Sequence, residues 1–316
     1  MSLAPPHRSG AALTVTEYTD PGCVVSWASE PRLRYLRLRY SALVHWRQVI
    51  GLQIADATRT DPGFTPEGAA PGYLRRWREV ADRTGTPITE RLRWMHHSTA
   101  PAGRAAIAAR AQGPGVAARV LRRLRELVFL HGTPVDSVER ARNSLGVVPG
   151  LDLPRLLRDM ESERVHETLR AEAAETRRVH PDTEIAARTG EPTPHPGTPV
   201  PDGGTHRYGF PTLVFQDHEH TLVVPGFRQV REYEAALEHL LPGVTARAAP
   251  LPSVTALLAE TGTLTAPEVS LLAGGELPPQ AQRLDGTTGE VWVRVAPSQH
   301  GPPADADSRR GTAPTA

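Results

Sequence analysis

The sequence lacks lysine entirely and contains a single cysteine, and each of these absences excludes a class of chemistry. All 36 basic residues are arginine, so no lysine can form a Schiff base or hold a nucleotide phosphate in a P-loop. One cysteine cannot form a disulfide within the chain or supply a cysteine-rich zinc site. Aromatic residues make up 5% of the 316 residues and hydrophobic residues 39%, so we expect part of the chain to be loop or tail.

Long apolar runs and net charge are lacking as well. No apolar segment approaches the roughly 20 residues that a membrane-spanning helix needs. Residues 1–10 are polar and lack the apolar core of a signal peptide. A formal net charge of +1 argues against a protein that binds nucleic acid over its whole surface. The sequence therefore predicts a cytoplasmic protein with no membrane partner and no nucleic-acid partner.

Apolar spacing predicts an α/β arrangement at the start of the chain and again after residue 205. Residues 12–18 and 43–50 have the pattern of strands, and residues 26–40 between them have the apolar spacing of a helix. Such a strand–helix–strand unit favours a parallel pair of strands. Residues 211–224 predict a hairpin around a polar tip, and residues 229–241 predict an amphipathic helix.

The remaining segments are predicted to be helices, loops and tails. Helical spacing recurs through residues 71–190, where glycine and proline separate the helices. Residues 191–205 are a proline- and glycine-rich loop with no reason to fold, and residues 1–10 and 297–316 are expected to be a disordered leader and tail. Within residues 253–296 we expect a helix over 253–260, a second helix begun by a capping box at Thr265–Glu268, a third helix over 278–284 and a strand over 290–295.

One predicted helix carries a cluster of arginines. Arg119, Arg122 and Arg123 fall on neighbouring sides of this helix and could together bind the carboxylates or phosphates of a ligand, and Arg125 follows them. We favour the simpler interpretation that the cluster is a solvated basic face.

The single cysteine follows a strand and a turn, at the expected start of a helix. Free backbone N–H groups and the helix dipole at such a position favour the reactive thiolate. The segment Thr19-Asp20-Pro21-Gly22-Cys23-Val24-Val25-Ser26-Trp27 and the distant Gly209-Phe210-Pro211-Thr212-Leu213-Val214 together resemble the DsbA branch of the thioredoxin superfamily. The nearest resemblance is to its FrnE-like and 2-hydroxychromene-2-carboxylate isomerase-like members.

This resemblance implies the fold and the domain boundaries. Residues 11–70 and 206–241 would form a thioredoxin-like α/β domain, and residues 71–190 an inserted helical domain. Residues 253–296 resemble a small winged-helix module that is attached to some proteins of this kind. Five acidic residues against two arginines give this module a net charge of −3, so we expect a docking or dimerisation element rather than a DNA reader. A homodimer is left open.

The resemblance also implies roles for individual residues. Cys23 takes the place of the redox cysteine, and Pro211 that of a cis proline that faces it and presents backbone to a bound thiol or peptide. Ser26 stands where a resolving cysteine would be, so a second thiol molecule must release any mixed disulfide on Cys23. The Ser26 hydroxyl could also lower the pKa of the thiol by a hydrogen bond. Substrate contacts are expected from Trp27, Phe210, Thr212, His97 and Ser98, and neither a metal nor a bound cofactor is expected.

Three functions follow as alternatives. The first is a DsbA-like monothiol oxidoreductase that forms mixed disulfides between Cys23 and a small thiol, such as glutathione, or a protein partner. The second is a glutathione-assisted isomerase or transferase that acts on a small aromatic substrate. The third is a redox-inactive thioredoxin-fold adaptor that holds a partner protein.

Overall fold

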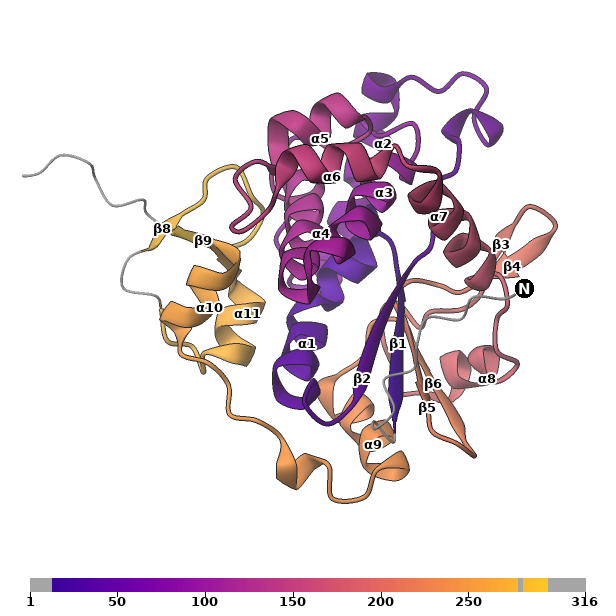
Figure 1. The fold of residues 1–316 in the computed structure, drawn as a ribbon, viewed down its shortest axis with the longest axis vertical. Helices are drawn as coiled ribbons and strands as arrows, with labels where there is room; N and C mark the ends of the chain where they lie inside the picture. The colour runs from indigo at the N-terminus through magenta and orange to yellow at the C-terminus, as the bar shows by residue number, and fades with distance from the viewer. Residues whose placement is uncertain (1–12, 278–280, 295–316) are drawn as a thin grey trace, which may run out of the picture.

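The computed structural model describes residues 13–277 and 281–294. These residues contain a four-stranded sheet with helices packed around it (Figure 1). The strands pair in parallel at one side of the sheet and antiparallel at the other, as the predicted strand–helix–strand unit and hairpin require. Both predictions are confirmed. In spatial order the strands are β2 (His45–Ile50), β1 (Thr14–Thr19), β5 (Thr212–Gln216) and β6 (Thr221–Pro225).

Helices α1 (Val24–Tyr40) and α9 (Val230–Leu240) cover one face of this sheet. Side chains alternate between the two faces of a strand, so Val15 points into the core under α1, whereas Tyr18 belongs to a separate cluster around Cys23. Leu33 of α1 and Phe215 of β5 are both fully buried in this core. The start of α1 is thereby fixed at the end of β1.

The chain between the parallel pair and the hairpin is mainly helical, and most of these helices are predicted by the sequence. Their largest apolar core joins α3, α4, α6 and α7, and it reaches the sheet at Ile50. The Ile50 amide donates a hydrogen bond to Glu172 of α7 at 2.7 Å, which ties these helices to the edge strand β2. The helices are α2 (Pro66–Thr84), α3 (Ala100–Ala109), α4 (Pro114–Phe129), α5 (Val138–Leu145), α6 (Leu153–Met160), α7 (Glu163–Glu175) and α8 (Asp182–Thr189).

The prediction that residues 191–205 have no reason to fold is wrong. Phe227 donates its amide hydrogen to the His195 carbonyl oxygen at 2.8 Å, and the buried Arg228 side chain donates to the Glu191 and Pro196 carbonyl oxygens. A Cβ on Gly197 would lie 2.2 Å from the Gly226 nitrogen, so glycine is required for this backbone contact. The segment then enters a short hairpin of β3 (Val200–Asp202) and β4 (Thr205–Arg207).

Between residues 250 and 294, the described part of the chain contains two α-helices and a three-stranded sheet. These elements are α10 (Val254–Thr261), β7 (Thr263–Thr265), α11 (Ala266–Leu272), β8 (Ala281–Arg283) and β9 (Val291–Arg294), with strand order β7-β9-β8. The capping box at Thr265 and Glu268 is confirmed. The third helix predicted over 278–284 is wrong at residues 281–283, which form strand β8. Residues 278–280, the predicted leader and the predicted tail lie outside the described residues.

The hairpin between β8 and β9 packs on the chain between α2 and α3. The Glu90 amide donates to the Gly286 carbonyl oxygen, and the Thr288 amide donates to the Ile88 carbonyl oxygen, each at 2.8 Å. These bonds anchor the C-terminal residues to a loop whose Pro87 carbonyl oxygen accepts the Trp27 indole hydrogen at 2.9 Å. The C-terminal module is therefore connected to the first turns of α1.

Buried ion pairs also join the C-terminal module to α1 and α4. The Glu268 carboxylate accepts two hydrogen bonds from Arg122 of α4, both at 2.9 Å, and one from Arg34 of α1 at 3.0 Å. Arg122 also donates to Glu126 at 2.8 Å. The interpretation of the arginine cluster as a solvated face is wrong for two of its members, since Arg122 is 4% exposed and Arg125 is 1% exposed. We call Arg34, Arg122, Glu126 and Glu268 the module lock.

Candidate thiol site

A buried carboxylate shapes the turn that delivers Cys23 to α1. Asp20 accepts hydrogen bonds from the Gly22 and Gln53 amides, each at 2.7 Å, and from the Thr99 hydroxyl at 3.0 Å. The Cys23 amide donates to the Asp20 carbonyl oxygen at 3.2 Å, which closes the turn. Cys23 then occupies the N-cap of α1 with extended backbone angles, as the sequence predicts.

The distant proline lies opposite this turn. The Phe210–Pro211 peptide bond is cis, so that prediction is confirmed. The Cys23 thiol donates to the Phe210 carbonyl oxygen at 3.5 Å across a sequence separation of 187 residues. The structure therefore brings Cys23 and the Pro211 loop together.

The environment of the thiol favours its protonated form. Cys23 is only 5% exposed, and Tyr18, Val49 and Phe210 surround it in one apolar cluster. Burial raises the pKa of Cys23, and the nearby Asp20 raises it as well. The Ser26 hydroxyl and the backbone amides of the first turn lower this pKa, but burial outweighs them. The sequence predicts a thiolate stabilised by the helix start, but burial in the fold favours the neutral thiol instead.

Ser26 is the side chain that would assist the thiolate. It is fully buried, and its hydroxyl oxygen has no hydrogen-bond partner among the described residues. The thiol donates its hydrogen to the Phe210 carbonyl oxygen instead. Ser26 is thus near enough to lower the pKa of Cys23, yet it leaves the thiol in its neutral form.

Two buried groups lie beside the thiol: Arg207, which the sequence reasoning misses, and His96, where the sequence reasoning selects the neighbouring His97 instead. Arg207 is 8% exposed, lies 4.8 Å from the centre of the Phe210 ring and is electrostatically coupled to Cys23 and Asp20. His96 is 2% exposed, and burial lowers its pKa to about 4. A Cβ on Gly22 would lie 2.8 Å from the His96 ring, so this glycine makes room for the imidazole. The only sequence signal for Arg207 is its place just before the Gly209–Pro211 segment.

Three of the residues predicted to contact substrate lie in different environments: Phe210, Trp27 and Thr212. Phe210 contributes its carbonyl oxygen at the thiol, while its ring packs over Gly51. Trp27 is 2% exposed and stacks on Phe129 in a core, so the structure places its indole away from the surface. Thr212 is fully buried and donates its hydroxyl to the Gly209 carbonyl oxygen at 2.6 Å.

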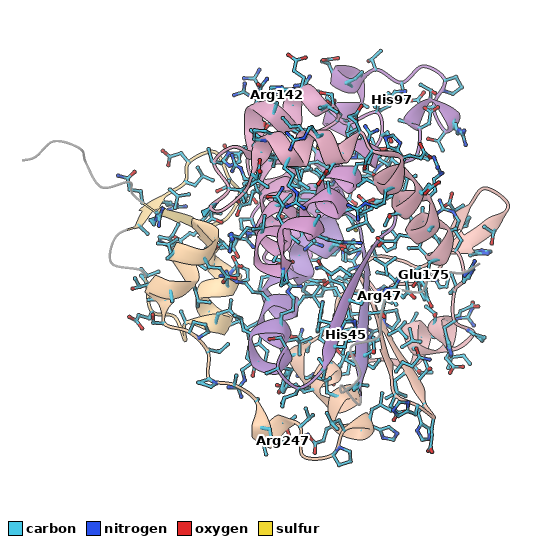
Figure 2. The ribbon with its side chains drawn as sticks, in the orientation of Figure 1. His45, Arg47, His97, Arg142, Glu175 and Arg247 are labelled. Atoms are coloured by element: carbon cyan, nitrogen blue, oxygen red, sulfur yellow. The ribbon has the colours of Figure 1, made fainter. Side chains whose placement is uncertain are left out.

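The two remaining residues predicted for substrate binding lie in the loop before α3. His97 is half exposed, and its Nε2 lies 3.3 Å from Asp56, near the periphery of the helices (Figure 2). The Ser98 hydroxyl donates to the Ile54 carbonyl oxygen at 3.1 Å and accepts from the Ala100 amide at 3.1 Å, so it holds the loop. The imidazole that packs on the cysteine turn is His96, not His97.

Two further properties bear on the class of site. No helix in the described ranges is long and apolar enough to cross a membrane. Within the same ranges, no group of three or more His, Cys, Asp or Glu side chains could hold a metal ion. The Cys23 site therefore consists of one thiol, a cis-proline loop and three buried charged or titratable neighbours, which are Asp20, His96 and Arg207.

Comparisons with known proteins agree with this geometry. A family model described as thioredoxin (Thioredoxin_5) matches residues 17–180. Two curated relatives are each named "ClpXP adapter protein SpxH". The one from Halalkalibacterium halodurans is 25% identical over 173 residues, which span 54% of this chain and only 56% of the relative. The one from Shouchella clausii is 22% identical over 294 residues, 92% of this chain and 87% of the relative.

A solved structure shares the fold. It comes from Nitrosomonas europaea, and its name places it provisionally among protein disulfide isomerases. It is 20% identical, with a TM-score of 0.50, over 72% of this chain and 95% of its own. The cysteine turn, α1 and β2 fall within the residues that the family model matches, and so does the second half of β1. The chain belongs to the thioredoxin family whose model it matches.

Proposed function

We propose that this protein is an adaptor that binds a partner protein through its DsbA-like fold, while Cys23 remains a protonated thiol. The observation that carries this proposal is the state of Cys23, which is 5% exposed, hydrogen-bonded to the Phe210 carbonyl oxygen and raised in pKa by burial. A thiol oxidoreductase needs an accessible thiolate. It also uses a second thiol to resolve the mixed disulfide, and Ser26 occupies that place.

The curated relatives support the same function by their name. Both are ClpXP adapter proteins, and one of them aligns with nearly the whole of this chain. We therefore propose delivery of a protein substrate to a ClpXP-type protease as the role of this chain. In this proposal the helices α2–α8 form an inserted helical domain, and residues 253–296 form a winged-helix-like module fixed to it by the module lock.

The experiment that tests this proposal separates binding from thiol chemistry. Purified ClpXP and an extract from the cells that produce this protein are mixed with either the wild-type protein or the Cys23→Ala variant. Protein half-lives in the two mixtures are then followed by quantitative mass spectrometry. We expect both proteins to accelerate the loss of the same small set of substrates. Acceleration that requires Cys23, or no acceleration by either protein, would contradict the proposal.

A monothiol oxidoreductase is the second candidate, and the position of Cys23 opposite the Pro211 loop favours it. In this function the Cys23 thiolate attacks the glutathione sulfur of a protein–glutathione mixed disulfide, becomes glutathionylated and releases the protein thiolate. A glutathione thiol then attacks the disulfide on Cys23, which forms oxidised glutathione and regenerates the Cys23 thiol. Intact-mass measurement after incubation with oxidised glutathione tests this step, because a stable adduct on the folded wild type, absent in Cys23→Ala, is its required product.

A further inference from the structure

A cavity away from Cys23 lies between α1, α4, the edge strand β2 and the end of α10. Its volume is about 580 Å³, within the usual range for small-molecule sites. One wall is apolar, and the remainder is dominated by guanidinium groups. The apolar wall consists of Leu38, Pro114, Ala117, Ala118 and Leu121, and the charged lining consists of Arg34, Arg37, Arg110, Arg119, Arg122, Arg125, Glu30 and Glu260.

The charges of this arginine cavity are arranged in two layers. Six arginines line it, whereas only two carboxylates do. The other carboxylates that pair with these arginines do not line the cavity, so they neutralise the guanidinium groups from behind. These are Glu17, Glu126, Glu172 and Glu268. The space itself therefore faces an excess of hydrogen-bond donors.

Two arginines keep donors that the protein does not use. Arg125 is 1% exposed, and its Nε has no hydrogen-bond partner among the described residues. This Nε is itself buried, so it adds positive charge behind the lining of the cavity rather than a donor on its open surface. Arg119 makes one hydrogen bond in the described chain, from Nε to the Pro149 carbonyl oxygen at 3.0 Å, and pairs with no described carboxylate.

The free edge of β2 adds backbone donors. The His45 and Gly51 amides bond to β1, so in this parallel register the amides of the even-numbered residues point to the outer edge. The Ile50 amide confirms this direction, because it donates to Glu172 outside the sheet. By the same alternation, the Trp46 and Gln48 amides face the edge at which both residues line the cavity.

We propose that the arginine cavity binds a small organic anion. A carboxylate or phosphate group would accept hydrogen bonds from the terminal nitrogens of Arg119, and an apolar body would lie against Ala117 and Leu121. Arginine suits such groups because its planar donors match their oxygens in pairs. The lack of a free carboxylate partner at Arg119 leaves that side chain available without breaking the module lock.

A titration with two probes tests this site and distinguishes the two acid groups. Phenyl phosphate and benzoate are added to the full-length protein at constant ionic strength, and binding is followed by calorimetry and by tryptophan fluorescence, with Trp46→Phe to assign the signal. We expect saturable binding of at least one probe at one site per chain, and a fluorescence change that Trp46→Phe removes. The phosphate probe binding more tightly would identify a phosphate ester as the ligand type, and the reverse a carboxylate.

Two variants and a control make the result decisive. Arg119→Gln removes a ligand contact without touching the module lock and is expected to weaken binding by about tenfold, the effect of one charge-assisted hydrogen bond. Ala118→Phe, an exposed position on the cavity wall, fills the space and is expected to abolish binding. Arg142→Gln changes an exposed arginine on the outer surface of α5 and serves as the matched control (Figure 2).

Several outcomes would overturn the inference. It fails if neither probe binds saturably, if Arg119→Gln and Arg142→Gln weaken binding equally, or if Ala118→Phe binds as tightly as the wild type. Cys23→Ala is expected to bind the probes normally, because Cys23 does not line this cavity. Failure of the anion site therefore leaves the proposed adaptor function untouched, and failure of the adaptor function leaves the anion site untouched.

Discussion

The first turn of α1 and its middle turns bury ionisable groups in opposite ways. At the first turn, Cys23 and the adjacent His96 are buried, and within the described chain neither side chain forms a hydrogen bond or ion pair with a charged group. Burial raises the pKa of Cys23 and lowers the pKa of His96 to about 4, so both groups are neutral near pH 7. Two turns later, Arg34 enters the module lock, where every charge has a partner.

Glu268 shows the effect of those partners. Burial by itself would raise the pKa of its carboxyl, but Arg122 and Arg34 outweigh it and lower the pKa to about 2. A buried charge is thus kept beside the middle of α1, where two arginines contact it directly, whereas at the first turn the nearby Arg207 does not outweigh the burial of Cys23. The contrast indicates that α1 has a structural end, which holds the C-terminal module, and a closed thiol end.

The largest expected effect comes from breaking the paired region. Glu268→Gln keeps the shape of the side chain and its capping contact but leaves Arg34 and Arg122 without their shared carboxylate. Removing one partner of a buried ion pair leaves the other charge uncompensated, so we expect a loss of about 3 kcal/mol in the free energy of unfolding. Urea unfolding followed by circular dichroism measures it.

The control for this variant is Glu276→Gln, an exposed carboxyl in the same module. It should change the free energy of unfolding by less than about 0.5 kcal/mol. Equal effects of the two substitutions would show that the module lock contributes no special stability, and the contrast between the two ends of α1 would be lost.

The second prediction separates the two ends by pH. The folded pKa of His96, about 4, lies below its ordinary value of 6.5, so the unfolded chain takes up a proton that the folded protein refuses. Stability from this residue is complete above pH 6.5 and is lost as the pH falls toward 4, by about 3 kcal/mol. For Glu268 the contribution is present above pH 4.5 and is lost as the pH falls toward 2.

Urea unfolding of wild type and His96→Gln across these two windows measures the difference. The variant is expected to lose the contribution of His96 to the pH dependence of stability between pH 6.5 and 4. It is expected to keep the contribution of Glu268 below pH 4.5. His97→Gln is the matched control, because this neighbouring imidazole is half exposed. If His96→Gln keeps the full slope of the wild type above pH 4.5, then His96 is not a buried neutral group.

The thiol end of α1 could be predicted from local sequence, whereas the module lock could not. A strand, the Pro21-Gly22 break and helical spacing after Cys23 are neighbours in the chain, so their pattern gives the structure directly. Arg34 and Glu268 are 234 positions apart and carry no periodic signal. The sequence predicts a solvent-exposed position for Arg122, because a run of charged residues on a helix usually faces solvent.

The burial of Cys23 was beyond local pattern for a similar reason. The helix start favours a thiolate, but the closing of Tyr18 and Phe210 around the sulfur depends on segments that meet only in the fold. The 191–205 loop illustrates the same limit, since the carbonyl oxygens that order it are bound by Arg228 from beyond the hairpin. Composition predicts its flexibility, and tertiary hydrogen bonds remove it.

The smallest effect tests how much the helix start still assists the thiol. Because the Ser26 hydroxyl lowers the pKa of Cys23, Ser26→Ala should raise this pKa further. The pH dependence of alkylation by iodoacetamide measures the shift in the folded protein. Ser29→Ala, which removes another fully buried hydroxyl without a partner in the described chain, is the matched control and should leave the profile of Cys23 unchanged.

A downward shift in Ser26→Ala would mean that the hydroxyl stabilises the thiol rather than the thiolate. In that case the whole first turn, including Ser26, would keep the sulfur protonated. The difference between this neutral turn and the charged module lock would then be larger. An unchanged profile would assign the state of Cys23 to burial by Tyr18 and Phe210 alone. Either result distinguishes a hydroxyl retained for packing from one that still assists the ionisation of Cys23, which is the remaining link between this thiol and the redox chemistry of its family.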